Sequence, residues 1–171
     1  MPGLLRRFAD WQHLIVAVLV SWLIVTSPWI AMLGRLPREP GPLDYAHVGL
    51  GLGLLPLAVL YSIACLRNGR WRLYFPWLAG EFGTMLADVR GLLRGRVPSA
   101  EGGGLFAALE GFVLLALLAT AATGGAWWWT AGTSEAFHWR SHHIVAARML
   151  IVLVVAHAAS VSLHVLEFVK D

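Results

Sequence analysis

The segment from Ser141 to Val169 constrains the fold of this chain more than any other part of the sequence. It is apolar and contains no proline or glycine. At about 1.5 Å per residue, a helix over this segment is long enough to cross a bilayer core of roughly 30 Å. A histidine inside a membrane helix is costly and needs a partner, so several on one span require an explanation. This span carries four, at His142, His143, His157 and His164.

Two of these histidines, His143 and His157, are fourteen residues apart. That distance is just under four helical turns, so both imidazoles point to nearly the same side, about 21 Å apart along the axis. One helix therefore offers nitrogen ligands at two depths on a single stripe. Such an arrangement would place two haems on top of each other in a membrane.

The composition indicates a membrane protein, because 58% of the 171 residues are hydrophobic and only 13% are charged. We expect one domain over residues 1–171. The single Cys65 excludes an internal disulfide and a Cys-x-x-Cys-His site for covalent haem. A haem in this chain would therefore be of the b type. No basic run, glycine-rich phosphate loop or hydrolase nucleophile motif is present, and we expect no nucleic-acid partner.

Four apolar segments predict an all-α, up-down-up-down integral membrane four-helix bundle. Arg6 and Arg7 precede the first run as in a secretory signal, but the run is long and lacks a small-x-small cleavage site, which indicates a retained span. Between spans two and three, we expect Phe75 to Leu93 to form a helix lying on the membrane surface. The spans are expected at about residues 10–32, 43–66, 105–129 and 141–168.

The basic residues predict the orientation of these spans. The N-terminus, the connection after the second span and the C-terminus contain nine Lys or Arg, whereas the two opposite loops contain three. The positive-inside rule therefore places both termini in the cytoplasm. The nine are Arg6, Arg7, Arg67, Arg70, Arg72, Arg90, Arg94, Arg96 and Lys170, and the three are Arg35, Arg38 and Arg140; Arg148 lies within the fourth span.

This topology predicts the depth of each histidine. His13 enters from the cytoplasmic side, and His47 and His143 lie just inside the opposite side. His157 returns toward the cytoplasm. The predicted pairs are therefore His47 with His143 and His13 with His157. Two imidazoles per iron would give six-coordinate haems, which are closed to exogenous ligands and suited to electron transfer.

Small residues follow two of these histidines at four-residue steps. Ala17 and Ser21 follow His13, and Gly51 follows His47. Such strips would let a flat macrocycle lie against the helix. Taken alone, His13 is better explained as an interfacial histidine, and the small residues that follow it and His47 usually indicate close helix packing.

Three segments carry a resemblance to a known family: WQH around His13, YAHVGLGLGLL around His47 and SHHIVAARMLIVLVVAHAASVSLH at the end. They resemble the prokaryotic four-helix cytochrome b561 family, which includes b-type subunits of membrane hydrogenases. The resemblance covers nearly the whole chain. It implies two haems b ligated by His13, His47, His143 and His157 in the bacterial inner membrane. It also implies electron exchange between quinone and a redox partner subunit or soluble carrier.

Several assignments stay open. His142 and His143 are adjacent and point about 100° apart, so only one can face the bundle; the resemblance and the fourteen-residue gap favour His143. His164 matches the depth of His13 almost as well as His157 does, or it could meet a propionate or quinone. Relatives often have a histidine early in the third span, where this chain offers Glu110, which could supply a protonatable group or bond to a neighbour inside the bundle.

Further residues are candidates for supporting roles. Trp127, Trp128 and Trp129 follow one another at the end of the third span, and their expected role is anchoring at the membrane interface, with a docking surface as the alternative. Arginines that could pair with haem propionates are Arg6, Arg7, Arg38, Arg140 and Arg148.

Two functions are compatible with these features. The first is a di-haem cytochrome transferring electrons between the quinone pool and a redox partner protein or enzyme complex. The second is a haem-free membrane transporter or assembly scaffold that uses its histidines for metal binding or proton relay. The second does not require ligands at two matched depths, which favours the first.

Overall fold

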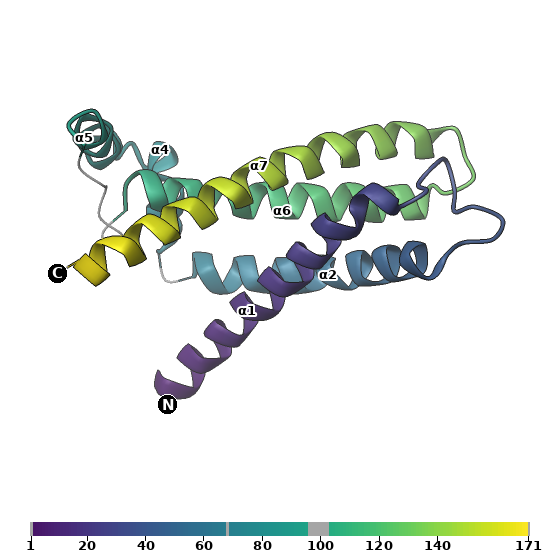
Figure 1. Cartoon of the computed structure of the whole chain (residues 1–171), viewed down its shortest axis with the longest axis horizontal. Coiled ribbons are helices and arrows are strands. Elements are labelled where there is room, and N and C mark those ends of the chain that lie inside the picture. The colour runs from purple at the N-terminus through teal and green to yellow at the C-terminus, as the bar shows by residue number, and fades with distance from the viewer. Residues whose placement is uncertain (1, 68, 96–102, 171) are drawn as a thin grey trace. The chain divides into compact units, whose positions relative to one another are not determined.

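The computed structural model describes residues 2–67, 69–95 and 103–170, with side chains described outside residues 2–10 and 164–170. Within these ranges the chain is helical and contains no strand, so the predicted all-α class is confirmed. Figure 1 shows the elements in chain order. They are α1 (Pro2–Thr26), the 3₁₀ helix η1 (Ser27–Trp29), α2 (Pro42–Leu66), α3 (Trp71–Tyr74), α4 (Pro76–Ala79), α5 (Phe82–Leu92), α6 (Leu105–Trp129) and α7 (Glu135–Lys170).

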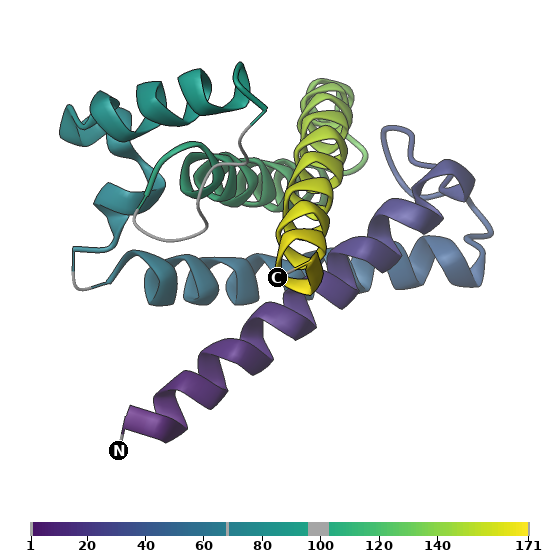
Figure 2. The ribbon, with the colours of Figure 1, turned by 60° about the vertical axis from the view of Figure 1, so that its left-hand side comes forward.

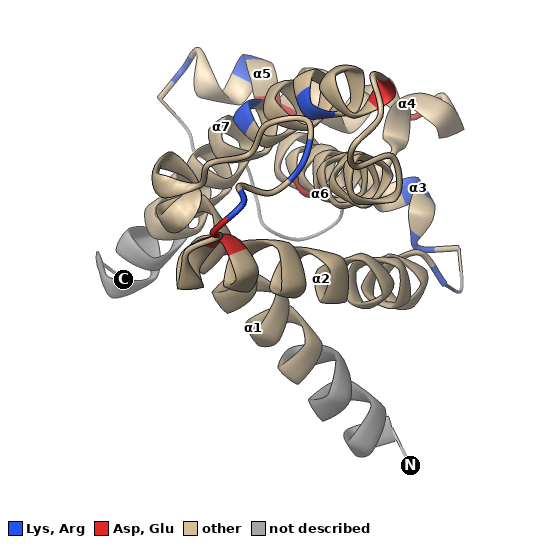
Figure 3. Cartoon of the chain, turned by 90° about the vertical axis from the view of Figure 1, so that its right-hand side faces the viewer, with Lys and Arg blue, Asp and Glu red and all other residues tan. Residues whose placement is uncertain are grey.

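Within the described residues, four segments are long and apolar enough to cross a membrane, namely Trp11–Trp29, Pro42–Leu66, Leu105–Trp129 and Glu135–Leu163. The predicted four-helix membrane architecture is thereby confirmed. Figure 3 shows that charged residues are concentrated in the connections and at helix ends, whereas the long helices contain few of them.

Two helix boundaries differ from those expected. The first helix ends at Thr26, before the 3₁₀ turn that contains Pro28, because proline lacks the amide hydrogen that a continuing helix would use. The last helix begins at Glu135, inside what the sequence indicated as a connection. Glu135 lies in its first turn, where a negative charge interacts favourably with the helix dipole.

The expected single helix from Phe75 to Leu93 is wrong. Phe75 has φ −127° and ψ 60° and separates α3 from α4. Gly80 ends α4 with φ 72°, a left-handed conformation in which glycine has no Cβ to clash. The chain therefore turns twice before α5 begins, and Figure 2 shows this bent path between the end of α2 and the start of α6.

The chain divides into two compact units along its length. The first unit contains residues 1–64 and 116–149, and the second contains residues 65–115 and 150–171. The helices α2, α6 and α7 thus each contribute one part to either unit. The expectation of a single membrane domain over residues 1–171 stays a prediction.

In the first unit, polar bonds tie the connection between α1 and α2 to its surroundings. The buried carboxylate of Asp44 accepts hydrogen bonds from the amides of Ala31 (3.0 Å) and Gly41 (2.9 Å). The indole of Trp127 donates to the Leu33 carbonyl at 2.7 Å. The bonds to Ala31 and Leu33 join residues 13 and 94 positions apart in the sequence, so this connection has a defined conformation beside the ends of α2 and α6.

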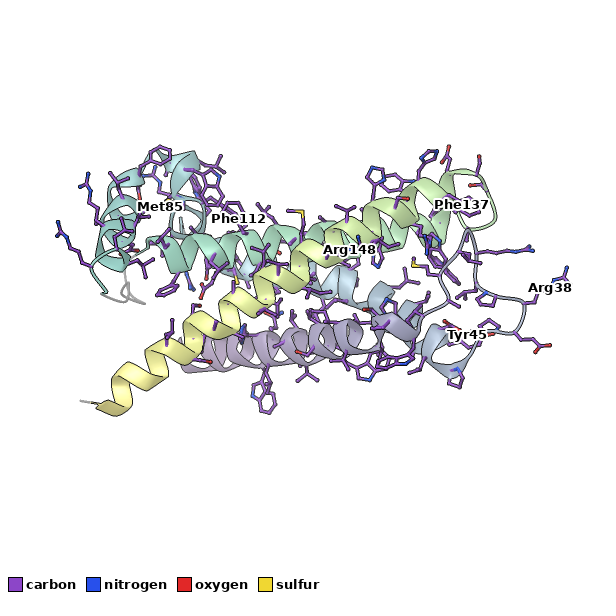
Figure 4. All side chains as sticks on the ribbon, turned by 45° about the horizontal axis from the view of Figure 1, so that its top comes forward. Arg38, Tyr45, Met85, Phe112, Phe137 and Arg148 are labelled. Atoms are coloured by element: carbon purple, nitrogen blue, oxygen red, sulfur yellow. The ribbon has the colours of Figure 1, made fainter. Side chains whose placement is uncertain are left out.

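In the second unit, aromatic contacts attach the α3–α5 segment to α6. The ring of Trp77 stacks on Phe112 with centroids 4.6 Å apart and an interplanar angle of 14°, and it also meets Phe75 edge-on at 5.5 Å. Figure 4 shows Phe112 on α6 beside this segment. Stacked aromatic pairs of this kind contribute about 0.5–1.5 kcal/mol beyond the burial of their area.

Candidate functional site

His143 points from α7 toward α6 within the first unit. Its Nδ1 lies 3.0 Å from the carbonyl oxygen of Thr120 and 3.5 Å from the hydroxyl of Thr123. A carbonyl oxygen can only accept, so Nδ1 carries the proton and donates. The lone pair is then on Nε2, which is the tautomer that a metal-binding histidine needs.

Gly124 makes room for the His143 ring. A Cβ built at this position would lie 3.1 Å from both Cε1 and Nδ1 of His143, closer than ordinary contact. A larger residue would therefore push the ring away from the Thr120 carbonyl. The hydrogen bond and the missing side chain at Gly124 together set the orientation of this imidazole.

His47 lies on α2 in the same unit, and its imidazole is close enough to interact electrostatically with that of His143. Its Nδ1 is buried and has no hydrogen-bond partner among the described residues. A buried nitrogen without a partner costs about 1–3 kcal/mol. Because this Nδ1 meets no acceptor there, the described residues do not hold His47 in one tautomer as they hold His143.

Open space adjoins the His47 helix one turn further along. Gly51 lies about 40° around the helix from His47, and a Cβ there would meet no atom within 4 Å. The helix surface beside His47 is therefore shallow and uncovered by protein. The imidazoles of His47 and His143, the second held in the metal-binding tautomer, and the open surface at Gly51 would fit a flat macrocycle held through its iron.

The neighbouring His142 points elsewhere. It is exposed, its Nδ1 lies 2.7 Å from the carbonyl of His138, and its ring is 5.8 Å from that of Trp139. Of the two adjacent histidines, only His143 faces α6, in keeping with their separation of about 100° around the helix.

His13 also belongs to the first unit. Its ring centroid is 6.1 Å from that of Tyr61 on α2, but the side chain is exposed. The buried stripe of α1 consists of Gln12, Val16 and Val20, one position earlier than the predicted strip of His13, Ala17 and Ser21. The predicted strip therefore lies beside the packed face of this helix and is uncovered by protein.

His157 belongs to the second unit and is half-buried on α7. Its carbonyl accepts a hydrogen bond from Ser160 at 2.7 Å. Because His13 and His157 lie in different units, their pairing stays a prediction. The side chain of His164, the alternative ligand, lies outside the described residues, as do those of Arg6 and Arg7.

Trp127 was expected at the membrane interface and Arg140 at a haem propionate. Both instead donate hydrogen bonds to backbone carbonyls of the connection between α1 and α2. Trp127 is 1% exposed and bonded to Leu33, so the expectation that it anchors at the membrane interface is wrong, whereas Trp128 and Trp129 are exposed. The guanidinium of Arg140 donates through Nε to the carbonyl of Met32. Arg148 and Arg38 are exposed, and Figure 4 shows Arg38 extending from the loop between α1 and α2.

Glu110 is exposed on α6 in the second unit and interacts electrostatically with Tyr74. Burial, followed by the nearby Cys65 and Glu110, raises the pKa of Tyr74 above its ordinary value of 10.0. The hydroxyl of Tyr74 also lies 3.4 Å from Arg70, which acts in the opposite direction. Tyr74 is therefore neutral and able to donate a hydrogen bond at physiological pH.

Sequence reasoning missed the residues that orient His143. Thr120 acts through its backbone carbonyl, which no side-chain motif reveals. Gly124 and its neighbour Gly125 do leave a signal, because paired glycines near the end of an apolar span indicate close approach of another group. Sequence reasoning also missed the role of Asp44 in the first turn of α2, whose two carboxylate oxygens accept hydrogen bonds from backbone amides.

The long apolar helices define a membrane protein, and two half-buried histidines in one unit, His47 and His143, are typical of membrane proteins that hold a metal macrocycle between helices. Comparison with known families is more specific, since residues 5–168 match prokaryotic cytochrome b561. The chain belongs to this family and is therefore a membrane b-type cytochrome that binds haem b and takes part in electron transport. Neither a curated protein nor a solved structure matches the chain.

Proposed function

We propose that this cytochrome transfers electrons between the quinone pool and a redox partner protein or enzyme complex, using two haems b. The observation that carries the proposal is the His143 imidazole, whose Nδ1 donates to Thr120 and leaves Nε2 for iron, next to the half-buried His47 of α2. In each pair one ligand comes from the last helix, with His47 and His143 in the outer site and His13 and His157 in the inner one.

Each residue of the outer site has a separate task in this proposal. His47 and His143 would hold the iron, which supplies reversible one-electron oxidation and reduction when haem is bound. The Thr120 carbonyl keeps the His143 proton on Nδ1 and raises the basicity of the ring. Gly124 holds the ring plane in place by leaving it space. With His47 and His143 both holding the iron, the site would favour electron transfer over oxygen binding.

The proposed location is the bacterial inner membrane, with both termini in the cytoplasm. The nine basic residues of the termini and the α2–α6 connection support this orientation. A cysteine-accessibility assay in intact cells tests it. Cysteines introduced at Arg38 and Arg94 in a Cys65→Ser background should react with a membrane-impermeant reagent only at position 38. Reaction at position 94 and not at position 38 would show that the topology is the reverse of the proposed one.

Haem stoichiometry is the first test of the proposed function. The purified protein should contain two haems b, measured by the pyridine haemochrome, with low-spin bis-imidazole spectra. A ratio near one haem per chain, or a ferrous form that binds carbon monoxide stoichiometrically, would contradict the two-site proposal.

Exchange with quinone is the second test. A reduced quinol analogue should reduce the haems of the purified protein in liposomes, and an oxidised quinone should reoxidise them. If neither reaction occurs with any quinone tested, the electrons follow another route and the quinone part of the proposal is wrong.

Single histidine variants separate the two sites. His47→Ala and His143→Ala should lose the outer haem or make it five-coordinate, while the inner spectrum persists; His13→Ala and His157→Ala should show the complementary loss. His142→Ala is the matched control and should keep both haems. If His164→Ala loses the haem that His13→Ala loses while His157→Ala keeps both, the inner ligand is His164.

A further inference from the structure

Helix α5 and the residue that follows it carry an apolar stripe that no described part of the protein covers. At about 100° per residue, the side chains of the stripe fall within an arc of about 60°. Their exposed fractions run from 40% to 83%, high values for side chains of this type in a single patch. The stripe consists of Phe82, Leu86, Val89 and Leu93.

The opposite side of α5 is attached to the start of α6. The carboxylate of Asp88, about 130° around the helix from the centre of the stripe, accepts a hydrogen bond from the amide of Leu105 at 2.9 Å. The preceding Gly104 has φ +114°, and the Asp88 carboxylate occupies the place where a Cβ of residue 104 would be. The Asp88 edge of α5 is therefore turned toward protein and its apolar side outward, whereas the apolar side of a helix in a water-soluble protein is buried.

The path of the chain determines the level at which α5 lies. Candidate spans end at Leu66 and begin at Leu105, so the connection between them starts and finishes at the same membrane face. Through Asp88, α5 is bonded to the first residue of α6, and Figure 2 shows it next to this end of the helix. The stripe is thus held at the level where α6 enters the bilayer, where lipid is available to contact it.

Two arginines lie along one flank of the stripe. Arg90 and Arg94 are exposed and, among the described residues, neither forms an ion pair with a carboxylate. The two acidic groups of this segment with described partners are engaged elsewhere, Glu81 with Arg72 at 3.7 Å and Asp88 with Leu105. Arginine binds phosphate oxygens through a planar fork of donors, and long basic side chains beside an apolar face reach up to the lipid headgroups.

We propose that α5 lies in the plane of the membrane with its stripe at the acyl boundary, and that Arg90 and Arg94 bind the phosphate of an anionic phospholipid. Lipid is favoured over a protein partner because the stripe lies at the membrane entry of α6 and is flanked by two arginines that form no ion pair with any described carboxylate. This site is independent of haem ligation, so its test does not depend on the proposed electron-transfer function.

Spin labels test the immersion of the stripe. In a Cys65→Ser background, Leu86→Cys and Leu93→Cys carry nitroxides on the stripe, and Thr84→Cys carries one about 170° away as the matched control. In bilayers of phosphatidylcholine and phosphatidylglycerol, the labels at 86 and 93 should be relaxed more by oxygen than by a water-soluble nickel chelate. The label at 84 should be relaxed more by the nickel chelate than by oxygen. Water accessibility at 86 and 93 would overturn the proposal, as would shielding from both reagents, which would indicate a covering protein partner or second copy.

Native mass spectrometry tests the phosphate site. Replacing Arg90 and Arg94 by Gln should weaken binding of the first phosphatidylglycerol by roughly fivefold per arginine, the equivalent of about 1 kcal/mol for each charge at a lipid surface. The matched control replaces the exposed Arg35 and Arg38 of the α1–α2 connection by Gln and should leave binding unchanged. Haem content should stay constant in both variants. Equal weakening in the two variants, or no weakening in either, would overturn the assignment to Arg90 and Arg94.

Discussion

Two glycines on α6 leave room for another part of the chain, and the neighbour differs between them. Gly124 in the first unit faces the imidazole of His143, whereas Gly111 in the second unit faces the backbone carbonyl of Tyr74 and the ring of Phe75. The same small residue thus admits a candidate haem ligand near one end of the helix and a turn of the connecting chain near the other.

The difference matters because a side chain can be displaced by an added methyl group more easily than backbone can. The His143 ring can rotate by a small amount, so a methyl group at position 124 would mainly change its orientation. The Tyr74 carbonyl is fixed by the α3–α4 path, so a methyl group at position 111 would displace the chain itself. The first glycine is therefore expected to affect the cofactor and the second to affect stability.

The largest stability effect should come from Gly111→Ala. Overpacking costs typically about 1–3 kcal/mol, and the upper end applies because the obstructing atoms are backbone. Thermal unfolding in detergent should show a clearly lowered midpoint. Gly49→Ala is the matched control, since a Cβ there meets no atom within 4 Å, and its midpoint should not fall. Equal unfolding midpoints for Gly111→Ala and Gly49→Ala would show that the close backbone contact at Gly111 does not limit stability.

Asp44→Ala should follow in size. It removes the acceptor for two amides of the first unit, and part-buried amides left without partners cost about 1–3 kcal/mol. Asp88→Ala removes the acceptor for one amide of the second unit and should lower the unfolding midpoint less. If Asp88→Ala lowers the unfolding midpoint more than Asp44→Ala does, the second unit depends more on its hydrogen bonds than the structure indicates.

Gly124→Ala should change stability by only about 1 kcal/mol, with its main effect on the outer haem. Displacing the His143 ring weakens its hydrogen bond to Thr120, so the midpoint potential and the electron paramagnetic resonance g-values of one haem should shift while the other haem is unchanged. Gly125→Ala, which would touch Leu55 at an ordinary 3.4 Å, is the control and should leave both signals in place. A shift of both haems would mean that the perturbation spreads beyond His143.

The smallest effect should come from Tyr74→Phe and should depend on pH. Because burial raises the pKa of Tyr74, its neutral form is favoured in the folded state. The resulting contribution to stability is fully present below pH about 10 and is lost as the pH rises through the raised value. The unfolding midpoint of the native protein should therefore decline with pH in this alkaline range more steeply than that of the variant. Identical declines would show that the Tyr74 hydroxyl has no part in alkaline stability.

The sequence by itself determined the membrane class, the four spans and the family. Each of these depends on local hydrophobicity or on motif spacing, which do not require knowledge of contacts. It also predicted that only one of His142 and His143 can face inward, because neighbouring residues of any helix point about 100° apart. The preference for His143 as the inward residue came from the fourteen-residue gap and the resemblance, and the contact with α6 agrees with it.

Only the tertiary structure decided the features that depend on contacts between segments distant in the sequence. It broke the expected Phe75–Leu93 helix at Gly80, because the left-handed turn there sends the chain back toward α6. It buried Trp127 against the Leu33 carbonyl, since an indole N–H satisfied by backbone is stable in the interior. It also revealed that Thr120 and Gly124 orient His143, because a backbone acceptor and a missing side chain acquire meaning only when another helix lies against them.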